Sequence, residues 1–194
     1  MIALLVFIIL ATIGSVVLAF ASTSSGAMDA MIQKDMQTRS VMDASNLVCK
    51  YMESKECEVE LYLDETSHKY EKTSKVEETF IKKLNDSVVK MKNNKSNKET
   101  IKFEVTNDGP DFDIEQVIGK MTLTQDENPN ILDPIQVSIE FEGKENHAKT
   151  QASMMGYVKE DVRVEYDSNK DTYQNNTYYI IYFSNPVIEI GGSK

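Results

Sequence analysis

Residues that could do chemistry are few and scattered in this chain of 194 residues. The two histidines, His68 and His147, lie far apart in the sequence. Neither fits a spacing that holds zinc or a motif that activates a serine or cysteine. The chain also contains no glycine-rich dinucleotide fingerprint and no P-loop. We therefore predict that the protein is not an enzyme and carries no cofactor.

Three carboxylates, Asp108, Asp111 and Asp113, crowd into one predicted turn. Carboxylate oxygens suit calcium, but this spacing differs from that of an EF-hand loop. Acidic turns are also common simply as solvated segments. The three residues are therefore a weak calcium candidate, and we predict no other metal site.

Two cysteines, Cys49 and Cys57, lie eight positions apart. A location outside the cytoplasm would permit a local disulfide between them, which would tie the end of a helix to the next segment. Two ordinary thiols are the alternative.

Tyrosines gather near the C-terminus. Alternation along a strand places Tyr178 and Tyr182 on one face and Tyr179 on the other. One face is expected to be core, and the other is a candidate surface for contact with a partner, because tyrosine is enriched at interfaces. Burial of both faces is the alternative.

The element that must organise these residues begins the chain. Residues 1–21 contain no charged side chain, no proline and a single glycine. A helix of about 20 apolar residues spans the roughly 30 Å core of a bilayer. The stretch predicts a single-pass protein of the cell membrane with its C-terminal domain outside. Ala19-Phe20-Ala21 also fits a signal peptidase site, and cleavage there would release a protein that begins at Ser22.

Apolar residues then recur at helical spacing through residues 28–53, with charged residues between them. We predict one long helix, apolar on all sides in its first half and one-sided in its second, which covers a sheet. The side chains expected to pack on that sheet are Met28, Ile32, Met36, Val41, Leu47, Val48 and Tyr51.

A second helix is predicted over residues 74–91, after a capping-box spacing at Ser74. From residue 99 onward the period of apolar residues changes to two, which indicates five or six strands. The predicted fold class is α+β: a long N-terminal helix, apolar in its first half, packed on an antiparallel β-sheet, with one additional amphipathic helix. The predicted domains are a helical half over 1–27 and an extracytoplasmic domain over 28–194, in which 28–53 continue the helix.

The net charge is −10, and every charged side chain lies at or after Asp29. Phosphate binding requires clustered lysine and arginine, so nucleic acid is not expected as a partner. We interpret the acidity as a property that keeps an exported domain soluble.

This plan resembles that of the type IV pilins, in which a long, half-apolar helix carries a compact antiparallel sheet. The apolar run from Ala3 to Leu10, with Gly14 and Ala19 beyond it, is similar to the start of mature pilins and pseudopilins. Residues 42–52 are similar to the helical stretch that follows in one branch of minor pilins. The likeness covers roughly the first quarter of the chain, and the C-terminal domain shows no motif of that family.

The resemblance implies a structural minor pilin or pseudopilin of a type IV pilus or related filament, anchored in the cytoplasmic membrane before assembly. Its partners would be other pilin subunits, contacted through the N-terminal helix, the membrane and the pilus assembly machinery. An ordinary membrane anchor is the alternative interpretation of the same helix. The residues expected to make membrane and assembly contacts are Ala3, Leu4, Leu5, Phe7, Ala11, Gly14, Ser15 and Ala19.

The chain departs from the family pattern at its start. Major pilins have an acidic residue early in the mature helix, and residues 1–7 contain none here. A subunit without that acid suits a priming position or a filament tip, where no neighbouring amino terminus has to be neutralised. The alternative function is a single-pass or secreted extracytoplasmic binding domain unrelated to pili.

Overall fold

The computed structural model describes the backbone of residues 2–64, 67–73, 79–93, 95–106, 116–127, 129–144, 147–167 and 171–190. Side chains are described over the same ranges except at residues 2–21, 37, 79, 167 and 190. Two compact units divide the chain, Met1–Arg39 and Ser40–Lys194, and each is described by itself. The elements in chain order are α1 (Ile2–Met52), η1 (Lys55–Cys57), β1 (Val59–Asp64), β2 (Lys69–Lys72), α2 (Thr79–Lys92), β3 (Lys98–Val105), β4 (Val117–Thr124), β5 (Ile135–Gly143), β6 (Lys149–Asp167) and β7 (Thr172–Ile190).

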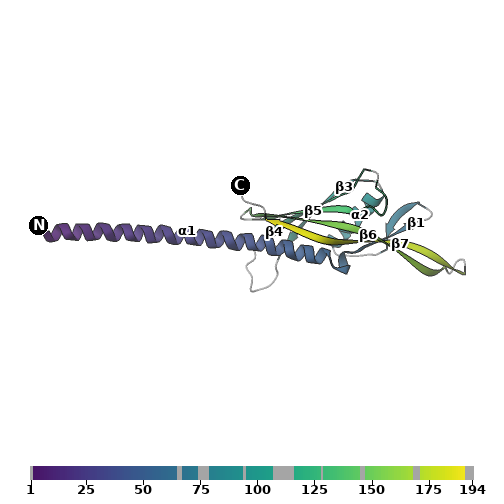
Figure 1. Cartoon of the computed structure of the whole chain (residues 1–194), viewed down its shortest axis with the longest axis horizontal. Coiled ribbons are helices and arrows are strands. Elements are labelled where there is room, and N and C mark those ends of the chain that lie inside the picture. Colours follow the sequence, from purple (N-terminus) through teal and green to yellow (C-terminus); the bar gives the residue numbers. More distant parts are fainter. Residues whose placement is uncertain are drawn as a thin grey trace. The chain divides into compact units, whose positions relative to one another are not determined.

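The described strands form one antiparallel sheet in the order β2-β1-β7-β6-β5-β4-β3 (Figure 1). From β3 to β7 each strand pairs with the next along the chain, so this part is a meander made of local connections. β7 then pairs with β1, which joins the end of the unit to its beginning. This last pairing is the long-range contact that completes the sheet.

One face of the sheet is buried because the register aligns its apolar positions across neighbouring strands. Met121 on β4 pairs with Ile101 on β3 and with Ile139 on β5, and Ile139 pairs with Ala152 on β6. None of these four side chains is more than 3% exposed. A slip of one residue would turn such a row toward solvent, so the burial of this face specifies the register.

Two helical segments cover this face, and all of their buried apolar side chains except Ile81 join those of the strands in a single hydrophobic cluster. On α2 the buried apolar residues recur at helical spacing, as expected for an amphipathic helix. They are Ile81, Leu84, Val88 and Met91. On α1 the buried apolar residues are Val41, Ala44, Val48, Cys49 and Met52.

A close approach of Phe103 to Gly119 shows how tightly this face is packed. A Cβ atom added to Gly119 would lie 2.3 Å from the Phe103 ring. The ring has little room to retreat, because it packs edge-on against Phe80 at 5.2 Å and against Phe141 at 6.2 Å between centroids. Glycine is therefore required at this position by space.

The predicted fold class is wrong, because the sheet is not backed by a long helix. Only residues 40–52 of α1 belong to the unit that contains the sheet. The described side chains of α1 therefore fall into two short parts, an exposed part over residues 22–36 and a part over 40–52 with buried positions from Val41 onward. Strands supply most of the regular structure of Ser40–Lys194, and β6 and β7 have 19 residues each.

The residues predicted to pack on the sheet are mostly buried or half-buried at the end of α1 and exposed before it. Val41 and Val48 are buried, and Tyr51 packs half-buried against the core. Leu47 is exposed, because it follows Val41 by six residues and so points about 240° around the helix from it. The other exposed members of the predicted set, which precede the unit that contains the sheet, are Met28, Ile32 and Met36.

Among the residues whose side chains are described, no helix is long and apolar enough to cross a membrane. The predicted location as a single-pass membrane protein, and with it the description as a transmembrane subunit of a type IV pilus, is therefore corrected. The residues predicted to make membrane and assembly contacts all fall within residues 2–21, outside the described side chains.

The polar segment between residues 64 and 74 contains the short strand β2. The polar sequence of β2 carries no apolar alternation, because β2 lies at the edge of the sheet and pairs only with β1 among the described strands. Polar edge strands lack the pattern by which strands are predicted.

Candidate functional site

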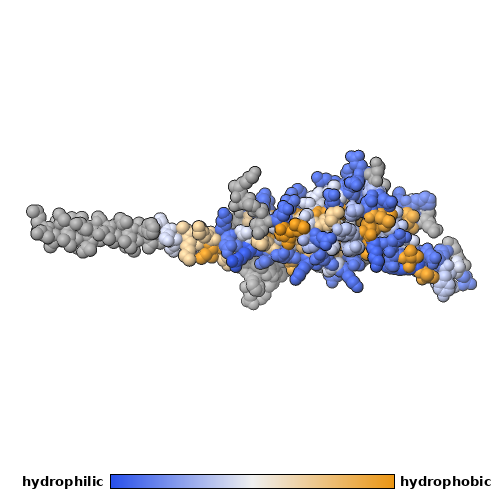
Figure 2. Space-filling view, in the orientation of Figure 1, coloured by the Kyte–Doolittle hydropathy of each residue, from blue (hydrophilic) through white to orange (hydrophobic). Residues whose placement is uncertain are grey.

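An exposed apolar stripe runs along the described part of α1 before the compact unit that contains the sheet. Met28, Met31, Ile32 and Met36 recur at helical spacing and are 65%, 74%, 49% and 64% exposed. Figure 2 shows this stretch as a band of hydrophobic colour beyond the grey atoms. We call these four residues the helix stripe. At its end the side chains of Arg39 and Asp35 form an ion pair of 2.9 Å, so the local charges cancel.

A second exposed apolar surface lies on the hairpin of β6 and β7. These strands pair with each other out to Asp167 and Thr172. The pairing of β5 with β6 ends at Gly156, and that of β1 with β7 ends at Tyr178. Residues 162–167 and 172–177 thus form a two-stranded ribbon to which no third described strand is paired (Figure 1).

The two faces of this ribbon differ in chemistry. One face carries Val162, Val164, Tyr166 and Tyr173, which are 57%, 67%, 55% and 73% exposed. The rings of Tyr166 and Tyr173, which are paired in register, lie 5.3 Å apart between centroids. In Figure 2 hydrophobic colour appears on this part of the molecule among pale and blue neighbours. We call these four residues the ribbon face.

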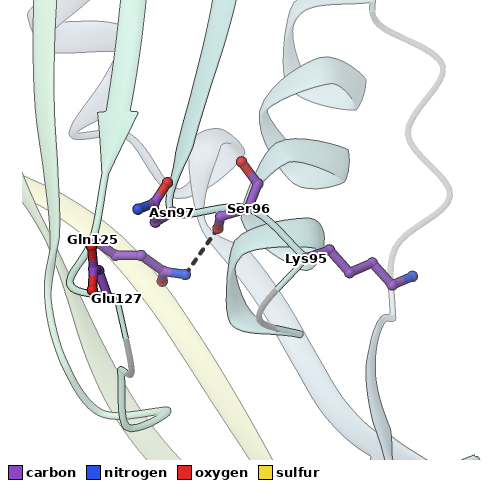
Figure 3. Close-up of a pocket in the computed structure, with 5 residues that line it drawn as sticks. All are labelled: Lys95, Ser96, Asn97, Gln125 and Glu127. Atoms are coloured by element: carbon purple, nitrogen blue, oxygen red, sulfur yellow. Dashed lines mark hydrogen bonds between the residues drawn. The ribbon is translucent and has the colours of Figure 1, made fainter.

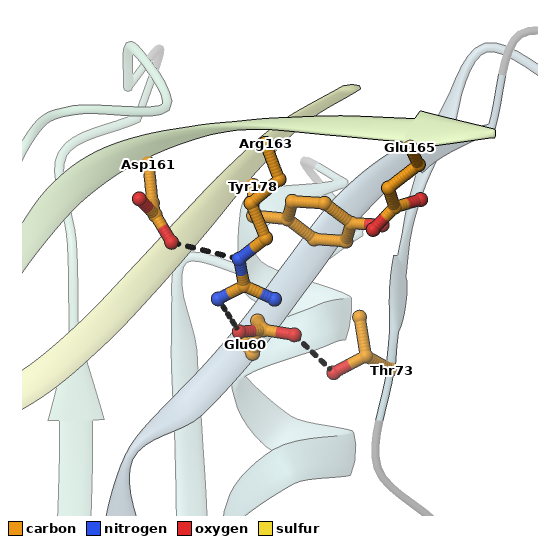
Figure 4. Close-up of polar contacts among 6 residues, drawn as sticks. All are labelled: Glu60, Thr73, Asp161, Arg163, Glu165 and Tyr178. Atoms are coloured by element: carbon orange, nitrogen blue, oxygen red, sulfur yellow. Dashed lines mark hydrogen bonds and ion pairs between the residues drawn. The ribbon is translucent and has the colours of Figure 1, made fainter. Parts of the chain in front are cut away.

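The opposite face of the ribbon is polar and engaged in contacts within the chain. Arg163 donates one hydrogen bond to Glu60 on β1 and another, of 2.8 Å, to Asp161 (Figure 4). Its guanidinium carbon lies 4.4 Å from the centre of the Tyr178 ring, a cation–π geometry. The Tyr178 hydroxyl donates to Glu165 at 2.7 Å. Arg163 therefore links three strands.

The charges of this cluster stabilise one another. Hydrogen bonds to Glu60 and then Asp161 raise the pKa of Arg163 further above its usual range. Hydrogen bonds from Tyr178 and Asn176 lower the pKa of Glu165, and the bond to Glu165 raises the pKa of Tyr178. These shifts keep Arg163 and Glu165 charged and Tyr178 protonated at neutral pH. The arrangement is a structural lock and not a catalytic centre.

A small polar pocket of about 280 Å³ lies where the end of β4 meets the turn after α2, lined by Lys95, Ser96, Asn97, Gln125 and Glu127 (Figure 3). The Gln125 amide nitrogen donates to the carbonyl oxygens of Met91 at 2.6 Å and Ser96 at 3.2 Å. Gln125 thus fastens the last turn of α2 to the sheet. Ligand pockets are commonly larger and mostly apolar, so we assign this one a structural role.

Lys92 is a buried amine in the last turn of α2 and is only 5% exposed. Its Nζ donates a hydrogen bond of 2.6 Å to the carbonyl oxygen of Asp133. Burial lowers the pKa of Lys92 from 10.5 to about 8, although the charge of Asp133 opposes that shift. This hydrogen bond joins the end of α2 to the segment before β5, so we assign Lys92 a structural role.

Cys49 and Cys57 are both buried thiols, and no disulfide joins them. The predicted disulfide is therefore absent from this structure. Burial, followed by the charge of Glu53, raises the pKa of Cys49, which disfavours the reactive thiolate.

The three predicted surface tyrosines have different environments. Tyr178 lies under Arg163, and Tyr179 packs half-buried against the core with its ring 5.6 Å from that of Tyr70. Tyr182 is 39% exposed, and its ring lies 5.8 Å from that of Tyr157. The face that carries Tyr179 is thus the core face. The ribbon face was missed because alternation predicts a buried strand without showing whether anything covers it.

The calcium candidates Asp108, Asp111 and Asp113 lie outside the described residues. Within the described part of the chain, no three or more histidine, cysteine, aspartate or glutamate side chains are grouped to hold a metal ion. His147 is exposed, and its ring nitrogen Nδ1 lies 3.1 Å from a carboxylate oxygen of Glu142.

Comparison with known proteins found no matching family model, no similar curated protein and no similar solved structure. The helix stripe and the ribbon face are thus the candidate functional surfaces, on geometry alone.

Proposed function

We propose that this chain is a structural, non-catalytic subunit, which assembles with other subunits through α1. The observation that supports the proposal is the helix stripe. Three methionines and an isoleucine stand on one side of a helix, each at least 49% exposed. Contiguous apolar surface of this kind marks a site of protein contact.

The composition of the stripe fits a contact between protein surfaces. Methionine is flexible and polarisable, so it adapts to irregular partner surfaces. The burial of one such side chain contributes about 1.5–3 kcal/mol. Several buried together would suffice for association once the entropic cost of binding is subtracted.

The described side chains also offer little to an enzymatic function. The buried lysine and the arginine cluster make structural hydrogen bonds, the two thiols lie within the hydrophobic cluster, and the polar pocket is small. A structural role for the chain is consistent with this distribution of its polar groups.

The test uses the full chain in mild detergent, with its association followed by sedimentation velocity over a range of concentrations. Met31→Glu places a charge at the most exposed residue of the stripe and should weaken self-association at least tenfold. The matched control is Ala30→Glu, which adds the same charge to an exposed position about 185° around the helix from the centre of the stripe.

Equal association of the two variants would refute the proposal, and so would a wild-type chain that remains monomeric at every concentration. In the second case the alternative function, a binding domain for a different partner, would be favoured.

A further inference from the structure

The ribbon face continues the core face of the sheet past the point where this chain covers it. Along β7, Phe183 and Ile181 are 2% and 0% exposed, Tyr179 is half-buried, and Tyr173 is 73% exposed. These residues share one face because they are two positions, or a multiple of two, apart. Thr177 and Asn175 lie between Tyr179 and Tyr173 on this face, but opposite them on β6 stand Val162 and Val164, so apolar side chains continue on the face after its cover ends. The pattern is that of a core surface whose second layer is absent among the described residues.

The opposite face of the ribbon is unsuited to the same role. Its arginine and glutamate already have partners within the chain, and breaking those hydrogen bonds would offset part of the free energy of any new contact.

The hydrogen bonds of Arg163 also fix the orientation of the ribbon. Because Arg163 connects the ribbon to Glu60 on β1, the ribbon is held in one orientation before a partner arrives, which lowers the entropic cost of binding.

Where the core face is covered in this structure, helices cover it. We propose that the helix stripe of a second copy of this chain packs on the ribbon face, so that the copies associate head to tail. This inference rests on the proposed assembly function and names the surface that receives the stripe.

The dimensions of the two surfaces agree. Met28 and Met36 are eight residues apart, which is about 12 Å along a helix. Val162 and Tyr166 are four residues apart, which is about 13 Å along a strand. Thioether sulfurs also make favourable contacts with aromatic rings, and the ribbon face offers two tyrosine rings.

Charge favours this pairing over a contact between two ribbon faces. Glu160 shares the face of Val162, and Asp171 beside the face is exposed, so two ribbons face to face would bring like charges together. The helix between residues 22 and 39 carries two acidic and two basic side chains and is neutral overall. It can therefore approach the acidic ribbon without net repulsion.

A contact between a helix stripe and a ribbon face leaves one free helix stripe at one end of every open complex and one free ribbon face at the other end. Each added copy then repeats the same contact, and the result is a ring if the rotation closes or a filament if it does not. Assembly of this kind needs no surface beyond the two described.

The test uses two full-length variants, prepared separately and then mixed. Met31→Glu damages the stripe and leaves the ribbon intact, whereas Val164→Glu does the reverse. Each alone should associate at least tenfold more weakly than the wild type. A one-to-one mixture should form a heterodimer and nothing larger, because one intact stripe meets one intact ribbon face. Ser153→Glu, at an exposed position on the outer face of β6 opposite uncharged residues, is the matched control for the added charge and should assemble normally.

Cross-linking supplies a second readout that does not depend on destabilising variants. A Met31→Cys copy and a Val164→Cys copy should be joined by a short bis-maleimide, while the native thiols stay unreactive because they are buried. An Ala30→Cys copy should not be joined to the Val164→Cys copy.

The outcomes separate the two proposals. If Val164→Glu assembles like the wild type, or the mixture forms no heterodimer, or the cross-link is absent, head-to-tail docking is refuted. In each of these cases the proposed function stands provided that Met31→Glu still dissociates the assembly. If Met31→Glu also assembles normally, both proposals fail.

Discussion

Replacement of Lys92 by methionine should change the stability of the protein in a way that depends on pH. Lys92 is buried with its Nζ on the carbonyl oxygen of Asp133, and its pKa is lowered from 10.5 to about 8. The folded state therefore favours the neutral amine more than the unfolded state does. Methionine keeps the apolar stem of the side chain and removes the amine, so Lys92→Met isolates this effect.

The sign follows from proton linkage. Between pH 8 and 10.5 the unfolded state binds more protons at Lys92 than the folded state, so this group favours folding increasingly as pH rises. Below pH 8 the lysine is charged in both states, and the full cost of burying the charge applies. Above pH 10.5 the amine is neutral in both states, and that cost is gone.

The magnitude follows from the same pKa values. A shift from 10.5 to about 8 corresponds to about 3 kcal/mol at 1.36 kcal/mol per unit. The variant also loses the hydrogen bond to Asp133, worth about 1 kcal/mol. We expect Lys92→Met to be about 2 kcal/mol more stable than the wild type at pH 7. At pH 10 most of the charge cost is relieved, so the two proteins should be nearly equal in stability.

Urea denaturation of both proteins, at a concentration too low for assembly, measures the difference between their free energies of unfolding at pH 7 and at pH 10. Lys83→Met is the matched control, because Lys83 is an exposed lysine on the same helix. The difference in free energy of unfolding between Lys83→Met and the wild type should be the same at both pH values. If the difference between Lys92→Met and the wild type is also the same at both pH values, the assignment of a buried, destabilised charge is refuted.

Three further predictions concern the core, the lock and the thiols. Gly119→Ala should lower the free energy of unfolding, measured in urea, by about 1–3 kcal/mol, because the added Cβ would meet the Phe103 ring. Gly26→Ala is the control and should not lower it, because a Cβ at Gly26 meets nothing within 4 Å. Equal effects of the two substitutions would contradict the packing argument. Arg163→Lys cannot make the same paired contacts and should speed amide hydrogen exchange in the ribbon but not in β3 and β4, whereas uniform exchange would argue against a local lock. Cys49 should react with a maleimide only after unfolding, and rapid labelling of the native protein would show that the thiol is accessible.

The sequence determined those features that depend on local periodicity. The period of two through Ile135, Val137 and Ile139 indicates a strand with one buried face, and these residues are buried. The period of a helix through Leu84, Val88 and Met91 belongs to α2. Such patterns can be recognised in the sequence without knowledge of the fold, because each arises from the geometry of one element.

Only the tertiary structure decided which apolar faces are covered. Val41 and Met28 belong to the same periodic stretch, yet Val41 is buried and Met28 is 65% exposed, because the unit that contains the sheet begins at Ser40. Val164 and Val137 are both apolar residues of alternating strands, yet only Val137 lies beneath a second layer. A periodic pattern states that a face is apolar, whereas its cover comes from residues distant in sequence or from another molecule. That difference separates the core of this protein from its candidate surfaces of assembly.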